Sequence, residues 1–470
     1  MKRIDRRQFI RFAGSGLVVL TTGGCTFKGT SQHGEGRPNF IFILTDDQRH
    51  DALGCAGNVS IRTPNMDALA SRGVRFENAF VTLSICSPCR AASLTGRYGS
   101  ANGVTSVPGT IDPDERTIAH ILRDAGYRTG MIGKWHLGNT PQQCGFDSAT
   151  YFMSNGPYYG RSVIDNGVEK TAKGYIEDYN ADRAIEFLKK SADSAQPFFL
   201  FYCPQVPHMN HEFDWPAREE TLALYDASEM PLPMTWRDDL ADKPPYLKDS
   251  RSRTQALHYG YDQAENVQRH WQRYYAAITE MDASLGRLLG AVDDLGLDDN
   301  TYIFLMGDNG WFMGEHGFTS KVLPYEESIR VPMIMTGPTV RPRVDDHLVL
   351  NIDIAPTVLD LAGLTTPQGI HGTSMRRLLR GRGPRWRRSF LYEAPTPSLG
   401  SWPLYAVRTD RWKYIQTFDK ANPQRLAFEE LYDLKTDPKE TTNLAGLARH
   451  AKRQAALKAE LYRLRAKLDT

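Results

Sequence analysis

The pattern of hydrophobic and polar residues divides the chain into strand-like and helix-like segments, which alternate. Residues 39–45 form a nearly continuous apolar run, which is typical of a strand buried on both faces of a parallel sheet. Similar runs predict further strands over residues 74–81, 128–133, 198–202, 301–306 and 331–335. Helical spacing and capping residues predict helices near residues 64–72, 115–125, 178–190 and 264–293. This alternation predicts an α/β fold, with a mostly parallel sheet between helices.

The pattern changes after Gly363. Short strand-like segments over residues 404–408 and 412–415 precede a last helix with leucines at positions 457, 461, 464 and 468. We therefore predict a large α/β domain over residues 37–371 and a smaller C-terminal α+β domain over residues 372–470. Residues 204–263 are polar and lack a clear period, which predicts a long loop of the functional or mobile kind.

The first 36 residues look like an export segment. Arg6-Arg7-Gln8-Phe9-Ile10 resembles a twin-arginine signal, and the uncharged stretch 12–24 is too short to span a bilayer. We predict a signal peptide over residues 1–25 and a tether over 26–36. Thr22-Gly23-Gly24-Cys25 resembles a lipoprotein box with Cys25 as the lipidated residue, and the alternative is a signal that merely ends in small residues. Either way we expect an exported, periplasmic protein, and it would be attached to a membrane only where Cys25 is lipidated.

Composition and charge exclude several classes of protein. Of the 470 residues, 41% are hydrophobic and 10% aromatic, so the chain has enough material for a large core and is not disordered or fibrous. The 57 Lys and Arg against 55 Asp and Glu give a net charge of +2. Five of these bases and one acid lie in the first eleven residues, which leaves 52 against 54. This balance gives no argument for a nucleic-acid partner.

Two predicted strands are followed by similar polar pairs. Asp46-Asp47 follows the strand over residues 39–45, and Asp308-Asn309 follows the strand over 301–306. Parallel strands place their carboxyl ends on one edge of the sheet, so both pairs would converge there. Three carboxylates and an amide oxygen suit Ca²⁺ or Mg²⁺. For either pair alone, the alternative is a set of turn or capping residues.

A twelve-residue motif lies between the two pairs, Cys86-Ser87-Pro88-Cys89-Arg90-Ala91-Ala92-Ser93-Leu94-Thr95-Gly96-Arg97. Taken as Cys-x-x-Cys, it could be a redox pair or a structural disulfide. Taken as Cys-x-Pro-x-Arg with Leu-Thr-Gly-Arg, it resembles the signature of the type I sulfatases, which belong to the alkaline phosphatase superfamily. The likeness extends over nearly the whole chain, through the motifs at residues 39–48, 133–138, 206–208, 307–310, 314–317, 325–332, 353–357, 431–434 and 437–438, with Lys321 shortly after the fifth of them. Cys89 departs from the family pattern, which usually has Ser or Ala there.

The resemblance implies an alkaline-phosphatase-like fold, with residues 37–371 as the catalytic domain. It also implies that a formylglycine-generating or maturase enzyme oxidises Cys86 to formylglycine, whose hydrate attacks sulfur. The implied metal ligands are Asp46, Asp47, Cys86, Asp308 and Asn309. Arg90 would hold the diol in place, and Lys134 and Lys321 would neutralise sulfate oxygens. His136 would act on the diol, and His208 would protonate the leaving oxygen. His316 would line the substrate pocket.

The implied function is hydrolysis of sulfate monoesters on a sulfated carbohydrate. Within the family, the motifs look most like those of the glycan sulfatases related to N-acetylglucosamine-6-sulfatase. One alternative is a phosphoester or phosphonate-ester hydrolase of the same superfamily. Another is a non-catalytic glycan-binding lipoprotein, which would not need the catalytic positions that are filled here. Seven arginines and no acid lie between His371 and Ser389. They would be solvated surface or, alternatively, would steer a polyanionic glycan.

Overall fold

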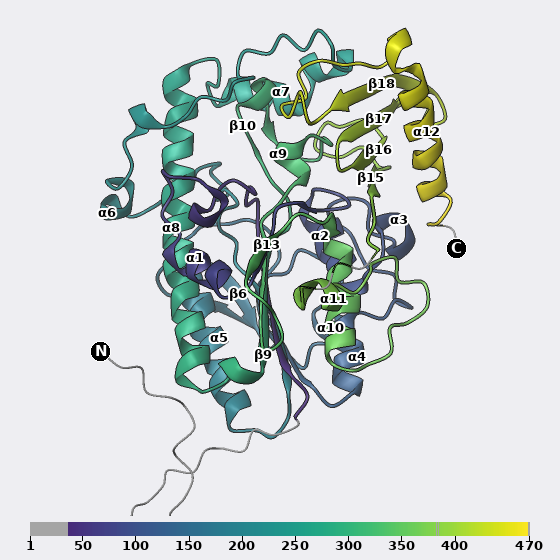
Figure 1. Cartoon of the computed structure of the whole chain (residues 1–470). Coiled ribbons are helices and arrows are strands. Elements are labelled where there is room, and N and C mark those ends of the chain that lie inside the picture. The colour runs from purple at the N-terminus through teal and green to yellow at the C-terminus, as the bar shows by residue number, and fades with distance from the viewer. Residues whose placement is uncertain (1–35, 382, 384, 469–470) are drawn as a thin grey trace, which may run out of the picture. The chain divides into compact units, whose positions relative to one another are not determined.

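Ten strands of the described chain form one central sheet, in the order β13-β2-β12-β9-β1-β8-β4-β5-β6-β7 (Figure 1). Their bounds are β1 (Asn39–Thr45), β2 (Val74–Phe76), β4 (Arg128–Lys134), β5 (Ser148–Phe152), β6 (Ser162–Asp165), β7 (Val168–Thr171), β8 (Phe198–Cys203), β9 (Thr301–Gly307), β12 (Met333–Thr336) and β13 (Arg343–Asp345). The central strands β9, β1, β8 and β4 are parallel. Their carboxyl ends therefore share one edge, as the sequence predicts.

The computed structural model describes residues 36–381, 383 and 385–468. From Arg37 onward the described chain belongs to one compact unit. The predicted signal peptide, the lipidation site at Cys25 and nearly all of the tether lie outside the described residues. Among the helices that are described, none is both long and apolar enough to cross a membrane.

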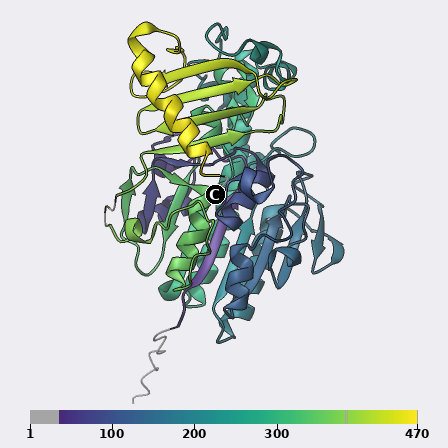
Figure 2. The same ribbon diagram turned by 90° about the vertical axis from the view of Figure 1, so that its right-hand side faces the viewer.

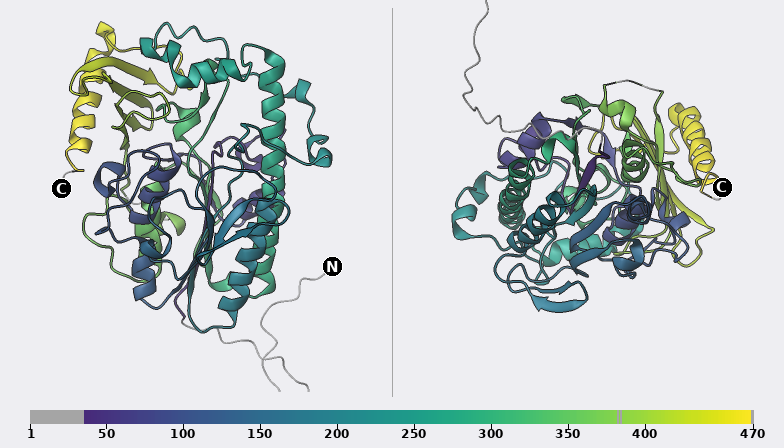
Figure 3. Two further views of the ribbon diagram at one scale, coloured as in Figure 1. Left: turned by 180° about the vertical axis from the view of Figure 1, so that it is seen from behind. Right: turned by 90° about the horizontal axis from the view of Figure 1, so that it is seen from below.

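Helices cover both faces of the central sheet (Figures 1 and 3). One face carries α1 (Pro64–Ser71), α5 (Ile176–Ala192) and α8 (Ala264–Asp294), and the other carries α2 (Cys86–Thr95), α4 (Ile118–Asp124) and α10 (Ile354–Leu361). Alternate residues of β1 enter separate cores, because successive side chains of a strand point to opposite faces. Ile41 belongs to the core that includes Ile278 of α8, whereas Phe42 belongs to the core that includes Val358 of α10. The α/β prediction is confirmed, with the sheet buried on both sides.

The single strand predicted over residues 74–81 is two short strands. β2 ends at Phe76, and β3 (Ala79–Phe80) pairs instead with β14 (Val349–Leu350), outside the central sheet. Between them, the side-chain amide of Asn78 donates to the carbonyl oxygen of Asp346 at 2.7 Å. The contact lies between the β2–β13 pair and the β3–β14 pair, so these two segments stay side by side beyond the end of the central sheet.

Two other boundaries shift for local reasons. The helix predicted from residue 115 begins at Ile118, because Thr117 caps it by accepting from the backbone amide of His120. The strand predicted from residue 331 begins at Met333, because Pro332 has no amide hydrogen for the ladder. The segment 204–263 is not a continuous loop: it holds α6 (Glu219–Leu222) and α7 (Arg251–His258). The remaining short elements are α3 (Gly99–Asn102), α9 (Glu326–Ile329), α11 (Arg376–Leu379), β10 (Phe312–Met313) and β11 (Thr319–Ser320).

The C-terminal part forms a smaller antiparallel sheet with one long helix, α12 (Ala451–Arg465), lying across it (Figure 2). Its strands are β15 (Ser389–Ala394), β16 (Leu404–Thr409), β17 (Trp412–Phe418) and β18 (Leu426–Asp433). Buried ion pairs connect it to α9: the Glu326 carboxylate lies 2.9 Å from Lys413 Nζ and 3.1 Å from Arg408 Nη2. α11 lies after residue 371 but packs with α10, which lies before it. The predicted domain division at residue 371 therefore stays a proposal.

Candidate active site

The two acidic pairs meet at the carboxyl edge of the sheet. β1 and β9 pair in register with Thr45 opposite Gly307, so the residues that follow each strand lie side by side. The backbone amide of Asp47 donates to Asp308 Oδ1 at 3.2 Å, and Asn309 Nδ2 donates to Asp47 Oδ1 at 2.6 Å. The expected convergence of these four side chains is therefore present in the fold.

Cys86 is the first residue of α2, and its thiol lies among the acidic pairs and two lysines. Its Sγ lies 3.4 Å from Asp46 Oδ1, 3.5 Å from Lys134 Nζ and 3.2 Å from Lys321 Nζ. Every residue of α2 is buried, and the first backbone amides of a helix have no partner within the helix. A helix start of this kind attracts an anion. Burial, together with the charge of Asp46, raises the pKa of the Cys86 thiol to about 12.

Cys86 and Cys89 do not form a disulfide, and the described cysteines are all free. The Cys89 thiol belongs to the core on the α10 side of the sheet, where Asn351 Nδ2 lies 3.5 Å from its sulfur. One thiol thus faces the polar site and the other faces the core. This separation does not favour the redox-pair interpretation of the motif.

Three buried cations balance the three carboxylates. Arg90 Nη2 lies 3.1 Å from Asp46 Oδ2 and 3.0 Å from Asp308 Oδ2. Lys134 pairs with Asp46, and Lys321 pairs with Asp47. All six side chains are at most 4% exposed. Buried charges need such partners, because an unpaired one is strongly unfavourable away from water.

The field of these groups separates the carboxyl pKa values. Burial would raise the pKa of Asp46, but Lys134 and its neighbouring cations hold that pKa well below its usual range. Burial raises the pKa of Asp47 to about 6, with Lys321 opposing the shift. Burial and repulsion from Asp46 raise the pKa of Asp308 to about 7. The carboxylates are thus crowded enough to gain from a further positive charge.

The arrangement fits a hard divalent cation. Asp47 Oδ2 and Asn309 Oδ1 are buried oxygens with no hydrogen-bond partner among the described residues. Ligand atoms of Asp46, Asp47, Cys86 and His208 all lie within 4.8 Å of one another. Unpaired buried oxygens are rare unless something else satisfies them. The donors are mainly carboxylate and amide oxygens, which suit Ca²⁺ or Mg²⁺.

The two predicted catalytic histidines also border this cluster. His208 Nδ1 lies 2.7 Å from the carbonyl oxygen of Met209, and its Nε2 lies 3.6 Å from Asp47 Oδ2. Burial and the charge of Lys134 lower the pKa of His208 well below its usual value. Burial and Lys134 also lower the pKa of His136, to about 2. His136 Nδ1 is buried without a partner in the described part of the chain.

Unusual backbone conformations surround the site. Asp47, His136 and Val322 have φ of 61°, 58° and 80°, in the left-handed region that favours glycine. Val322 is β-branched, so this conformation raises its free energy. It directly follows Lys321. Each of these residues is, or adjoins, a predicted site residue. Such strain concentrates at functional sites, where the surrounding fold holds side chains in place.

The structure places His316 apart from the Cys86 cluster. Its ring is fully buried, its Nδ1 lies 2.6 Å from Asp238 Oδ2, and it packs beside Phe318 and Tyr325. Its Nε2 has no partner within the described residues. Substrate contact by His316 therefore stays a prediction, and its visible contacts hold neighbouring loops together.

Two further residues border the site that the motifs do not single out. Trp311 lies with its ring centre 6.3 Å from that of His208 and 5.5 Å from Lys321 Nζ. Arg49 Nη1 donates to the Trp311 carbonyl at 2.7 Å. In the sequence, only their position next to predicted site residues marks them: Trp311 follows Asn309-Gly310, and Arg49 follows Asp46-Asp47-Gln48.

A family model described as Sulfatase matches residues 38–364. The chain belongs to the sulfatase family. A second model, described as N-sulphoglucosamine sulphohydrolase, C-terminal, matches residues 314–467. The sulfatase is therefore a sulfuric ester hydrolase. Its family generally uses a formylglycine and a divalent metal, and the acidic cluster described above is a possible metal site.

Relatives match along most of their own length. An N-acetylglucosamine-6-O-sulfatase of Bacteroides thetaiotaomicron is 31% identical, over 94% of this chain and 88% of that protein. An ulvan-active sulfatase of Formosa agariphila is 29% identical, over 92% and 82%.

A solved structure described as a complex with its substrate D-glucosamine-2-N,6-O-disulfate aligns with a TM-score of 0.82 and 29% identity, over 92% of this chain and 98% of that one. A phosphonate monoester hydrolase of Agrobacterium radiobacter aligns at 0.73 with 22% identity, covering 92% and 96%, and shares the fold. The predicted alkaline-phosphatase-like fold is thus confirmed.

Proposed function

We propose that this sulfatase hydrolyses sulfate esters of carbohydrates, with a formylglycine made from Cys86 as its nucleophile. The observation that carries the proposal is the position of the Cys86 side chain, between Asp46, Lys134 and Lys321 at the start of α2. The carbohydrate substrate is supported by relatives named for N-acetylglucosamine-6-O-sulfate and ulvan. A 6-O-sulfated N-acetylglucosamine unit is the first substrate to test.

Asp46, Asp47, Asp308 and Asn309, with residue 86, would hold a divalent cation, Ca²⁺ or Mg²⁺. When bound, such a cation lowers the pKa of a nearby hydroxyl and neutralises charge on sulfate oxygens. In the proposed reaction, one hydroxyl of the formylglycine hydrate attacks sulfur and the alcohol leaves. The second hydroxyl then loses its proton, sulfate is expelled, and the aldehyde is restored. An unmodified serine could not take that last step.

The surrounding cations have distinct tasks. Arg90 fixes Asp46 and Asp308 through its guanidinium, and it also donates to the Lys134 carbonyl at 2.6 Å. Both lysine ammonium groups lie against the Cys86 sulfur, the position that the hydrate would occupy. They can therefore stabilise negative charge on the sulfate as it develops.

The two histidines would move protons. The Met209 carbonyl can only accept a hydrogen bond, so Nδ1 of His208 carries hydrogen and Nε2 faces the site. A bound sulfate ester would favour a second proton on Nε2, because an adjacent negative charge favours the charged ring. His208 would then donate this proton to the leaving oxygen. His136 would accept a proton from the diol as the sulfate is expelled.

The remaining proposals concern maturation and location. Cys86 needs a formylglycine-generating or maturase enzyme as a partner. Residues 1–25 would direct export to the periplasm, with or without a lipid on Cys25, and residues 372–470 would form the C-terminal domain. Radiolabelled palmitate in wild type and Cys25→Ala tests the lipid: label that depends on Cys25 supports it, and unlabelled wild type contradicts it.

The function is tested by ion chromatography of sulfate released from a panel of sulfated sugars. The matched control is the phosphate ester of each sugar. We expect sulfate release, foremost from 6-O-sulfated N-acetylglucosamine, and much slower phosphate release. Hydrolysis of the phosphate esters alone would contradict the proposal and favour a phosphoesterase.

A further inference from the structure

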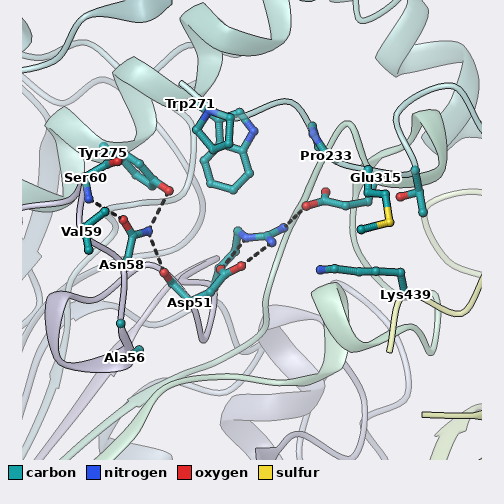
Figure 4. Close-up of a pocket in the computed structure, with 15 residues that line it drawn as sticks. Asp51, Ala56, Asn58, Val59, Ser60, Pro233, Trp271, Tyr275, Glu315 and Lys439 are labelled. Carbon is teal, nitrogen blue, oxygen red and sulfur yellow. Dashed lines mark hydrogen bonds and ion pairs between the residues drawn. The ribbon is translucent and has the colours of Figure 1, made fainter. Parts of the chain in front are cut away.

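A pocket lies near the cluster around Cys86. It has a volume of about 430 Å³, and its lining includes Arg49, Asp51, Trp271, Tyr275, Glu315 and Lys439 (Figure 4). Arg49 and Trp311 separate it from the cluster: Arg49 lines the pocket and donates to the Trp311 carbonyl, whereas the Trp311 ring lies near His208 and Lys321. The pocket therefore adjoins the part of the cluster that holds both His208 and Lys321.

The charged side chains of the pocket are already paired. The Arg49 guanidinium makes two 2.8 Å hydrogen bonds to the Asp51 carboxylate and lies 2.9 Å from Glu315 Oε1. Lys439 Nζ lies 3.3 Å from Glu327 Oε1. Two positive and two negative side chains line the pocket, each with an opposite charge beside it. The pocket therefore offers no unbalanced charge for a sulfate or a carboxylate, which favours an uncharged ligand.

The uncharged part of the lining offers hydrogen-bond donors. Trp271 is 4% exposed, and its Nε1 is buried with no partner among the described residues. The Tyr275 hydroxyl accepts from Asn58 Nδ2 at 2.8 Å, which leaves its own hydrogen to donate. In Figure 4, Trp271 and Tyr275 lie along one side of the pocket, with Asp51 and Lys439 across from them. An unpaired buried donor is unfavourable, so a ligand hydroxyl placed there would satisfy it.

Apolar side chains complete the lining. Val59 is 98% exposed and Met234 is 86% exposed, and both border the pocket. Exposed apolar side chains next to paired polar groups match a sugar ring, which has C–H faces and hydroxyl edges. Pockets for small ligands commonly combine an apolar lining with a few placed polar groups.

We propose that this pocket binds an uncharged sugar unit of the glycan, linked to the sulfated sugar at Cys86. The inference rests on the proposed function. The sulfated unit would be the leaving group beside His208, and the chain would continue past Trp311 into the pocket. The enzyme would then prefer oligosaccharides with a neutral neighbouring sugar to a sulfated monosaccharide or to one with a uronic acid neighbour.

The test uses Trp271→Phe and Tyr275→Phe, which keep an aromatic ring at each position and remove one donor each. Tyr259→Phe is the matched control, since that tyrosine bonds Gln255 and does not line the pocket. For a sulfated disaccharide with a neutral neighbour, we expect kcat/KM to fall about 3- to 10-fold per lost hydrogen bond. Activity on 4-nitrophenyl sulfate should stay unchanged in both variants, although the smaller ring of Trp271→Phe should lower the thermal midpoint. Unchanged disaccharide turnover, or equal losses on both substrates, would overturn the proposal.

Calorimetry with the desulfated disaccharide separates this inference from the proposed function. The desulfated disaccharide should bind to wild type and to Tyr259→Phe. Its affinity for Trp271→Phe should fall by the same factor as kcat/KM does. If no sulfated carbohydrate is hydrolysed but this binding is found, the proposed function fails and the pocket stands. If sulfated monosaccharides are hydrolysed but the neutral disaccharide does not bind, the function stands and the pocket proposal fails.

Discussion

His208 Nε2 lies 3.6 Å from Asp47 Oδ2, at the boundary between the predicted acid and the predicted metal ligands. The opposite ring nitrogen is fixed by the Met209 carbonyl at 2.7 Å. The loop is fixed as well, because Tyr158 donates its hydroxyl hydrogen to the His208 carbonyl at 2.7 Å. The imidazole is therefore held with Nε2 toward the reacting groups, as a general acid requires.

Replacing His208 with Gln should slow the reaction according to the leaving group. A sugar alcohol needs protonation, so kcat on a sulfated sugar should fall by about 100- to 10,000-fold. 4-Nitrophenol leaves without a proton, so 4-nitrophenyl sulfate should lose much less. His211→Gln, an exposed histidine on the same loop, is the control and should leave both rates unchanged. Equal losses on the two esters would argue against an acid role.

Removal of divalent metal should abolish activity. After chelation the crowded carboxylates lose their cation, so we expect no turnover and a lower thermal midpoint, both restored by Ca²⁺ or Mg²⁺. Asp47→Asn should cost at least about 100-fold in kcat/KM and weaken the metal response. The exposed Asp346 belongs to a second acidic group, with Asp345 and His347, and Asp346→Asn should behave as wild type. Full activity after exhaustive chelation would contradict the metal assignment.

Glu177 should make stability fall as pH rises. Its carboxylate accepts from the backbone amides of Gln205 and Val206, at 2.7 and 3.0 Å, and burial raises its pKa from 4.5 to about 7. The folded protein therefore holds this proton more tightly than the unfolded chain. The resulting stabilisation is complete below about pH 4.5 and is lost as pH rises through about 7.

Glu177→Gln removes this titration while keeping an acceptor for the two amides. Between pH 5 and pH 8, its free energy of unfolding relative to wild type should rise by up to about 3 kcal/mol. Chemical denaturation at several pH values measures the difference. Glu186→Gln, at a partly exposed position on the same helix, should show no such rise. A constant difference between wild type and Glu177→Gln across this range would refute the prediction.

Gly133 should not tolerate a side chain. It has a φ of 104°, and a Cβ there would lie 2.0 Å from the carbonyl oxygen of Cys203. Gly133→Ala should therefore destabilise the fold by roughly 1–3 kcal/mol or more and displace Lys134. Gly290 lies within α8 with nothing near its Cβ position, so Gly290→Ala should stabilise by about 0.5–1 kcal/mol. Thermal unfolding of both variants checks the contrast, and similar shifts would contradict it.

The sequence predicts the central strands and the meeting of Asp46-Asp47 with Asp308-Asn309 because both follow from local patterns. Apolar runs mark strands buried on both faces, and parallel strands end at one edge. The split of residues 74–81 depends on a contact of Asn78 with Asp346, far along the chain. Local periodicity carries no information about such a partner.

Side-chain surroundings are likewise set by distant contacts. His316 lies within a matched motif, yet its ring pairs with Asp238 from the irregular 204–263 segment. Among the arginines after His371, Arg376 pairs with Asp360 and Arg387 with Asp353. Those two are structural partners, which the sequence could not separate from solvated ones. The contact between Arg49 and Trp311 joins the loops after β1 and β9, which no local pattern of the sequence shows.

The proposed nucleophile is a formylglycine at position 86. Mass spectrometry of the peptide that contains residue 86, from active protein, tests it. We expect a mass about 18 Da below that of the cysteine peptide, the difference between a thiol and an aldehyde. Across preparations, the converted fraction should scale with specific activity, and Cys86→Ala should be inactive. Full activity in protein whose Cys86 is entirely unmodified would contradict the account.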